Sequence, residues 1–265
     1  MSIEVAAAQL IEASASGVPT TPVRELIGAT NVEAAYGVQQ RVTQARLAAG
    51  AHIIGRKIGL TSPAVQAQLG VDQPDFGVLF DDMAYADAAE VPMSRLLQPK
   101  AEAEIAFVLA DDLDCEITPE TVRAAIDHAV VALEIVDSRI ADWDITFADT
   151  VADNASSGLF SLGDHSLKLD EFEPRDTVMT MTIDGAVVST GSGEACLGDP
   201  LNALAWLAQT AKDFGEPLRA GQVILSGALG PMAPVAAGQT VVAELTTTDG
   251  RPLGTVTTPF IEESA

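Results

Sequence analysis

The apolar residues near the start of the chain recur with helical spacing. Val5, Leu10 and Ile11 form the apolar stripe of a predicted helix over residues 3–15. A second helix start is predicted at Thr21-Pro22, because threonine caps helices well and proline suits the first helical position. A longer helix is predicted over residues 32–49, ending at Gly50. The first fifth of the chain is therefore expected to be helical.

From residue 52 onwards the pattern favours strands. Residues 52–60 and 99–109 are predicted strands, and two hairpins are centred on Asp184-Gly185 and Asp249-Gly250. Strands with interspersed helices after a helical start indicate the α+β class. We expect a helical region over residues 1–50 and a β-rich part over residues 51–265, forming one structural unit. The other predicted elements are helices at 62–70, 118–129 and 199–208, strands at 130–140 and 223–227, and irregular segments at 70–77 and 142–157.

Two carboxylates lie inside one of the predicted apolar strands. Residues two apart in a strand share a face, so Glu102 and Glu104 would lie side by side. A second apolar run, residues 130–136, carries Glu134 in its middle. Carboxylates this close repel and lose solvation, and a hard cation such as magnesium or manganese would relieve both effects. The alternative is an exposed strand edge with solubilising charge, but Glu134 makes a metal site the preferred interpretation.

A lysine and two loops are further candidates for a site. Lys57 would share a strand face with Gly55 and Gly59, and glycine in a strand often marks close approach by a ligand or another backbone. The alternative is a surface lysine with a packed stem, and the pattern does not decide between them. Segments 70–77 and 142–157 are candidate site loops, although an ordinary turn is the simpler interpretation of 70–77 from composition alone.

Charge and composition restrict the expected partners. The chain has 38 acidic and 14 basic residues and a net charge of −24, which argues against nucleic acid and anionic membrane surfaces. It has neither a signal peptide at its N-terminus nor an apolar run long enough to span a membrane, so we expect a cytoplasmic protein. Cys115 and Cys196 lack metal or redox spacing and are expected to be reduced thiols.

Five short segments, in order along the chain, carry a family resemblance. They are residues 55–61 (GRKIGLT), 71–77 (VDQPDFG), 100–105 (KAEAEI), 133–137 (LEIVD) and 152–156 (ADNAS). Together they resemble the 2-hydroxypenta-2,4-dienoate (2-keto-4-pentenoate) hydratases of the fumarylacetoacetate hydrolase superfamily. The resemblance extends from about residue 30 to the C-terminus. It implies a mixed β-roll or sandwich core with a helical N-terminal region, in which residues 51–265 form the catalytic domain.

The same resemblance implies an activity and its residues. The enzyme would add water to a small anionic 2-hydroxy-2,4-dienoate to give a 4-hydroxy-2-oxo acid, in meta-cleavage degradation of aromatic or steroid rings. The substrate's carboxylate and 2-oxygen would chelate a divalent ion, Mg²⁺ or Mn²⁺. The implied metal ligands are Glu102, Glu104 and Glu134, the implied proton-transfer residues are Lys57 and Asp75, and the implied substrate-binding residues are Ser156, Ser226 and Gly227.

Other functions stay open at this point. A 4-oxalocrotonate-type decarboxylase or a C–C hydrolase of the same superfamily would use the same metal site, although segment 71–77 favours the hydratase. A non-enzymatic alternative is an assembly partner of a neighbouring pathway enzyme, but Lys57 and Asp75 are both present. The resemblance also implies a homo-oligomer and association with a neighbouring pathway enzyme.

Overall fold

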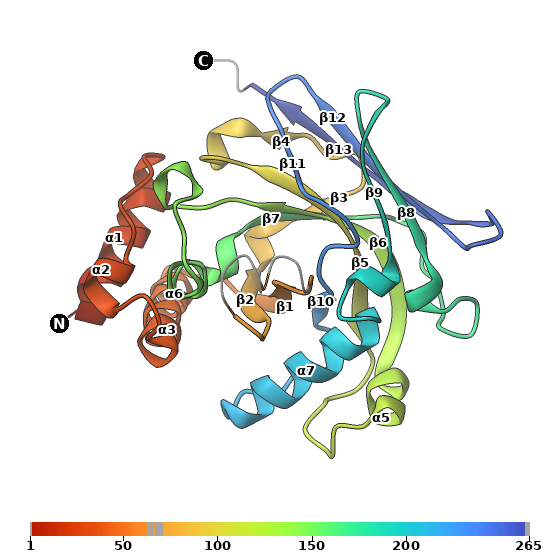
Figure 1. Ribbon diagram of the computed structural model, residues 1–265, viewed down its shortest axis with the longest axis horizontal. Helices are drawn as coiled ribbons and strands as arrows, with labels where there is room; N and C mark the ends of the chain where they lie inside the picture. The colour runs from red at the N-terminus through yellow and green to blue at the C-terminus, as the bar shows by residue number, and fades with distance from the viewer. Residues whose placement is uncertain (1, 63–65, 67–70, 263–265) are drawn as a thin grey trace.

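The computed structural model describes residues 2–62, 66 and 71–262, and its N-terminal helices gather on one side of the molecule (Figure 1). These are α1 (Ser2–Ser16), α2 (Arg24–Ile27) and α3 (Val32–Ala48), so the predicted helices at 3–15 and 32–49 are confirmed. The predicted apolar stripe of the first is wrong, because Val5 and Ile11 are exposed and α1 buries Leu10 with three alanines, Ala6, Ala7 and Ala13. The helix start predicted at Thr21 is wrong by two residues, because α2 is capped by Val23. Backbone hydrogen bonds between Thr20 and the segment at Arg139–Ala141 keep this stretch extended.

Two mixed sheets form the rest of the fold. The larger has eight strands, in the order β2-β1-β10-β5-β6-β7-β3, with β11 also paired to β5. Its strands are β1 (Ile53–Gly59), β2 (Asp75–Phe80), β3 (Ala84–Ala86), β5 (Lys100–Leu109), β6 (Ile126–Val136), β7 (Ser157–Leu162), β10 (Val223–Leu225) and β11 (Ala233–Pro234). The smaller sheet has the order β4-β13-β12-β8-β9. Its strands are β4 (Val91–Pro92), β8 (Val178–Ile183), β9 (Ala186–Ser192), β12 (Thr240–Thr246) and β13 (Pro252–Ile261).

Local sequence signals account for several of these elements. Asp184 and Gly185 both have positive φ in the β8–β9 turn, as a two-residue hairpin turn requires. Asp199 caps α7 (Pro200–Asp213) by accepting a hydrogen bond from the Leu201 amide, 2.9 Å away. Both hairpins and the helix predicted from residue 199 are therefore confirmed. Six 3₁₀ turns in the described residues complete the fold: η1 (Asp81–Met83), η2 (Met93–Arg95), η3 (Ala141–Trp143), η4 (Asn154–Ser156), η5 (Pro174–Asp176) and η6 (Gly193–Ala195).

Three predicted segments differ from the structure. The helix predicted over 118–129 ends early, as α5 (Pro119–Ala124), because the chain from Ile126 pairs with β5. Segment 70–77 is not a loop throughout, since Asp75 begins strand β2. Segment 142–157 contains α6 (Phe147–Ala152), whose residues are all buried. The short helix predicted at 62–70 lies largely outside the described residues.

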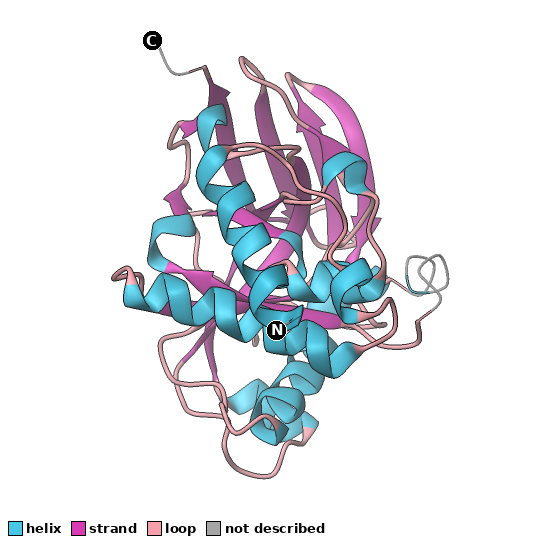
Figure 2. Cartoon of the chain, turned by 90° about the vertical axis from the view of Figure 1, so that its left-hand side faces the viewer, coloured by secondary structure: helices cyan, strands magenta, loops and turns pink. Residues whose placement is uncertain are grey.

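The hydrophobic side chains form two clusters. The main cluster fills the space around the two sheets, with the side chains of Phe107, Phe160 and Phe260 fully buried. The second joins the N-terminal helices to α6, so a helix from the β-rich part completes the core of the helical region. Figure 2 shows these helices packed against one side of the strands. The prediction of an α+β fold is confirmed. Among the described residues, no helix is long and apolar enough to cross a bilayer.

Candidate active site

Three glutamates share one face of the β5–β6 pair. Glu102 lies directly opposite Glu134 in the antiparallel register, and Glu104 follows two residues along the same face of β5. Each residue offers a carboxylate oxygen, and these three oxygens lie within 4.8 Å of one another. Glu104 and Glu134 are fully buried, and Glu102 is half-buried. The structure therefore brings together the three acids that the sequence singled out.

The cluster has too few hydrogen-bond donors for its carboxylates. Glu104 Oε2 accepts a 2.8 Å hydrogen bond from the Gly227 amide, but Glu104 Oε1 and Glu134 Oε2 have no partner among the described residues. Burial, followed by the charge of Glu134, raises the pKa of Glu102 to about 7. Burial and the two neighbouring glutamates hold the pKa of Glu104 well above its ordinary value. Oxygen-only donors with unused acceptor atoms fit a hard divalent cation.

Lys57 points from β1 towards these carboxylates. Its side chain is buried, and Nζ lies 3.2 Å from Glu134 Oε1. Burial lowers the pKa of Lys57, but the charges of Glu134 and Asp75 raise it by more, so the net shift is upward. The upward shift favours the ammonium form of Lys57, and the alternative of a surface lysine is wrong.

Asp75 lies beside Lys57 because a glycine makes room for it. Gly59 on β1 is opposite Asp75 on β2, and a Cβ added to Gly59 would lie 2.2 Å from Asp75 Oδ1 and 3.3 Å from Lys57 Nζ. Gly55 has a different cause, because a Cβ there would lie 1.9 Å from the carbonyl oxygen of Val223 on β10. Burial raises the pKa of Asp75 despite the opposing charge of Lys57.

Ser156 is connected to Asp75 through Thr150, a residue that sequence reasoning missed. Thr150 Oγ1 lies 3.4 Å from Asp75 Oδ2 and 3.2 Å from Ser156 Oγ. Three successive residues, 154–156, adopt left-handed φ values between 52° and 55°, which turns Ser156 back towards α6. The sequence carried little signal for Thr150, since it lies in a segment predicted to be irregular.

The two residues after β10 contribute differently. Gly227 has φ of 114°, and a Cβ there would lie 2.5 Å from Thr61, so glycine allows its amide to reach Glu104. The carbonyl oxygen of Ser226 accepts a 3.0 Å hydrogen bond from Cys196 Sγ, while Ser226 Oγ has no partner among the described residues. Burial and the charge of Glu104 raise the pKa of Cys196 to about 12, and neither cysteine forms a disulfide in the described residues.

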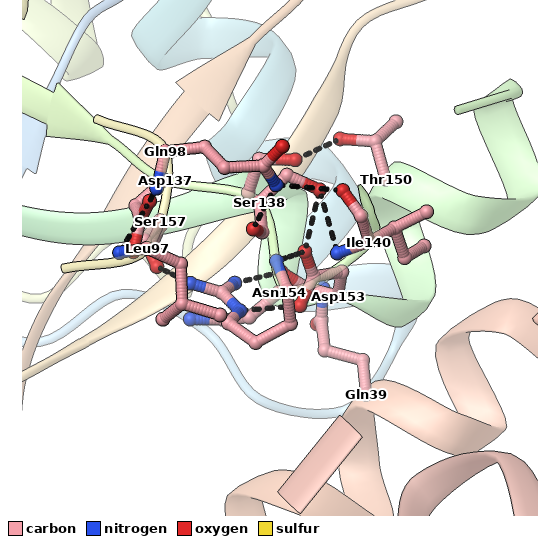
Figure 3. Close-up of polar contacts among 12 residues, drawn as sticks. Gln39, Leu97, Gln98, Asp137, Ser138, Ile140, Thr150, Asp153, Asn154 and Ser157 are labelled. Carbon is pink, nitrogen blue, oxygen red and sulfur yellow. Dashed lines mark hydrogen bonds and ion pairs between the residues drawn. The ribbon is translucent and has the colours of Figure 1, made fainter. Parts of the chain in front are cut away.

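A second buried polar cluster, centred on Arg139 and Asp153, lies between the strands of the larger sheet and the N-terminal helices (Figure 3). Asp137 and Arg139 are two residues apart but do not form an ion pair with each other. Arg139 forms an ion pair with Asp153 and donates to the carbonyl oxygens of Asp153, at 2.6 Å, and Ser157, at 2.7 Å. Asp137 instead accepts hydrogen bonds from the amides of Leu97 and Gln98. Arg139 thus holds both ends of the turn that contains Ser156.

Comparisons with known proteins identify the family of this chain. The family model described as fumarylacetoacetate (FAA) hydrolase C-terminal matches residues 52–261. A 2-keto-4-pentenoate hydratase from Burkholderia vietnamiensis is 52% identical over 262 residues, 98% of each chain. Another, from Paraburkholderia xenovorans, is 54% identical over 236 residues, 89% of this chain and 88% of the relative.

A solved structure is also closely similar. The 4-oxalocrotonate decarboxylase from Pseudomonas putida G7, complexed with magnesium and adipate, has a TM-score of 0.91 at 33% identity. The match covers 98% of this chain and 97% of that chain. The shared fold therefore accommodates a divalent ion, and the sequence is more similar to the hydratases than to this decarboxylase.

Proposed function

The chain belongs to the fumarylacetoacetate hydrolase family, among its 2-keto-4-pentenoate hydratases, and from this premise we propose how its buried side chains perform the reaction. The enzyme is a hydro-lyase of meta-cleavage pathways. It adds water to a 2-hydroxy-2,4-dienoate and forms a 4-hydroxy-2-oxo acid. The observation that carries the mechanism is the buried carboxylate cluster with unused acceptor oxygens beside a buried ammonium.

Glu102, Glu104 and Glu134 hold a divalent ion in this proposal. Magnesium or manganese fits best, because both are hard ions that prefer oxygen ligands and keep open positions for water or substrate. When bound, the ion supplies Lewis acidity and a template for the substrate's carboxylate and 2-oxygen. The Gly227 amide keeps Glu104 oriented through its 2.8 Å hydrogen bond.

Lys57 supplies the proton for the first step. The Lys57 ammonium donates a proton to C5, and the neutral amine then accepts the 2-hydroxyl proton, which gives a 2-oxo-3-enoate and restores the ammonium. The carboxylates of Glu134 and Asp75 keep Lys57 charged, so it acts as a donor and as positive charge near the developing enolate. Its burial excludes bulk water from this exchange.

Asp75 handles the water in the second step. The Asp75 carboxylate accepts a proton from the water that attacks C4, and this proton then reaches C3, so one water molecule is added overall. Asp75 belongs to a buried strand and not to the loop that the sequence suggested for residues 70–77. Thr150 and Ser156 offer hydroxyls for orienting the water or substrate. Ser226 and Gly227 complete the proposed substrate-binding residues.

Substitution of Asp75 tests this proposal against decarboxylation. Asp75→Asn should retain metal binding and still exchange deuterium at C5, but it should form little 4-hydroxy-2-oxo acid from the dienoate. Loss of the dienol is followed by ultraviolet absorbance with and without magnesium, and the products are identified by mass. The matched control is Asp72→Asn, an exposed acid three residues earlier. Release of carbon dioxide, or normal hydration by Asp75→Asn, would contradict the proposal.

We further propose that the enzyme is a cytoplasmic homo-oligomer that associates with a neighbouring pathway enzyme. One exposed aromatic side chain supports an assembly surface: Phe214 is 57% exposed although it contacts the rings of Tyr36 and Phe76. Sedimentation velocity of the isolated protein would test the homo-oligomer, and a monomer at micromolar concentration would contradict it.

A further inference from the structure

Lys100 shares the strand face of the carboxylate cluster but has no role in the steps above. It is the first residue of β5, two residues before Glu102, so both side chains leave the same face. Its Nζ lies 4.1 Å from the centre of the Trp143 ring, a cation–π contact. In the described part of the chain, no carboxylate lies within ion-pair distance of Lys100. The ammonium is therefore held in place without a direct ion pair, although burial lowers its pKa and the charge of Glu102 opposes that shift.

The tryptophan that contacts Lys100 is itself fixed by Gln98. Trp143 Nε1 donates to the carbonyl oxygen of Gln98 at 3.0 Å, and the Asp142 amide donates to Gln98 Oε1 at 2.7 Å. Gln98 Nε2 in turn donates to the carbonyl oxygen of Ile140 at 2.8 Å. Asp142 and Trp143 both have left-handed φ values, 57° and 54°. Unfavourable backbone conformations of this kind persist where the surroundings hold them, often at functional sites.

The ionised carboxylates of the site outnumber the positive charges beside them. Glu102, Glu104, Glu134 and Asp75 carry four negative charges when ionised, whereas a divalent ion and Lys57 supply three positive ones. An incoming dienoate adds another negative charge, and the whole chain carries a net charge of −24. An anion approaching this site is repelled unless a positive group lies near its path.

We propose that Lys100, held on Trp143, is a specificity-determining residue that attracts the dienoate carboxylate to the metal cluster. This inference rests on the proposed function, because it assumes a divalent ion at the three glutamates. A cation at this position has effects of opposite sign on the two ligands. It repels the divalent ion that its neighbours bind, and it attracts the anionic substrate. A lysine that only packs the site would affect both ligands in the same direction.

Calorimetric titrations of Lys100→Gln measure these two effects separately. The probes are manganese chloride, added to the metal-free protein, and oxalate, added to the manganese-loaded protein as an anion with adjacent oxygens. We expect Lys100→Gln to bind manganese about two- to fivefold more tightly and oxalate about tenfold more weakly. The KM for the dienoate should rise by a similar factor, while kcat changes by less than about threefold. Lys100→Arg should restore oxalate binding.

Two further variants complete the test. Trp143→Leu removes the aromatic support and should weaken oxalate binding in the same direction, by a smaller factor. Lys168→Gln removes an exposed lysine that pairs with Asp127 at 2.7 Å, and it should change neither titration.

The outcomes separate this inference from the proposed function. If Lys100→Gln weakens the binding of both manganese and oxalate, or leaves oxalate binding unchanged, Lys100 does not attract the substrate carboxylate, although the metal site stands. If the wild-type protein binds no manganese, the metal site itself is wrong and this inference falls with it.

Discussion

Two buried polar clusters in this protein both combine carboxylates with a positively charged side chain. They differ in how many hydrogen-bond donors surround each carboxylate. In the cluster of Figure 3, Asp153 is paired with Arg139 and also accepts from the Arg139 amide at 2.9 Å and Ser138 Oγ at 3.3 Å. In the cluster on β5 and β6, the described residues supply one hydrogen-bond donor to Glu104, and Lys57 forms an ion pair with Glu134. In the first cluster every carboxylate oxygen of Asp137 and Asp153 has a donor, so we call it the complete cluster. The second has carboxylate oxygens without a donor among the described residues, so we call it the incomplete cluster.

The comparison distinguishes a structural cluster from a site that requires a ligand. A buried acid with enough donors is compatible with its surroundings and makes them rigid. A buried acid without them is costly unless a cation binds or a proton is taken up. Burial alone therefore does not identify a catalytic acid. The number of donors around each carboxylate separates Glu104 from Asp153.

The largest effect is expected from removing a carboxylate of the incomplete cluster. Glu104→Gln should lower kcat/KM by about 10³-fold or more, because the ligand set for the metal is broken. The same change should raise the resistance of the metal-free protein to urea, because it removes repulsion from Glu102 and Glu134. Calorimetry with magnesium and urea titrations with chelator measure the two effects. The control is Asp127→Asn, an exposed acid on strand β6.

Full activity after exhaustive chelation, with no metal detected in the protein, would contradict this prediction. It would also remove the distinction between the clusters, since the unused oxygens would then need another explanation.

The complete cluster should respond in the opposite way. Arg139→Ala should lower the free energy of unfolding by about 3–5 kcal/mol, because it leaves Asp153 buried without its partner. Arg139→Lys should recover part of this loss, and Arg123→Ala, which breaks an exposed pair with Glu173, should cost at most about 1 kcal/mol. Urea denaturation measures all three variants. A stable Arg139→Ala protein would show that this cluster is not structural.

Lys57 belongs to the incomplete cluster, so its loss should affect chemistry more than stability. Lys57→Ala should reduce kcat by about 10²-fold, because the site loses its proton donor and a positive charge. Its effect on magnesium affinity should be smaller than that of Glu104→Gln. Steady-state kinetics at saturating magnesium provide the measurement. A variant with kcat near that of the wild type would leave Lys57 with a packing role only.

The smallest expected effect is on the pH dependence of stability without metal. The pKa of Glu102 is raised from its ordinary value of 4.5 to about 7, so between these values the folded state binds more protons than the unfolded state. Stability contributed by this group should therefore fall as pH rises from about 4.5 to 7, and change little above that. Glu102→Gln should flatten the decline in urea titrations with chelator. An unchanged slope in the variant would contradict this assignment.

The sequence alone determined the elements that depend on neighbouring residues. Helical spacing and end signals located α1 and α3, Asp199-Pro200 located α7, and Asp184-Gly185 located a hairpin. The shared face of Glu102 and Glu104 also followed locally, because strand alternation needs no partner. These signals act within a few residues, so tertiary packing altered them little.

Only the tertiary structure decided how these elements meet. The register between β5 and β6 places Glu134 opposite Glu102, and the pairing of β1 with β2 places Asp75 beside Lys57. Burial converted a segment predicted to be irregular into α6, and the donors around each acid decided which cluster is complete. Strand register and loss of solvent depend on residues far apart in the chain. Their energies therefore arise only once the sheets and helices have packed.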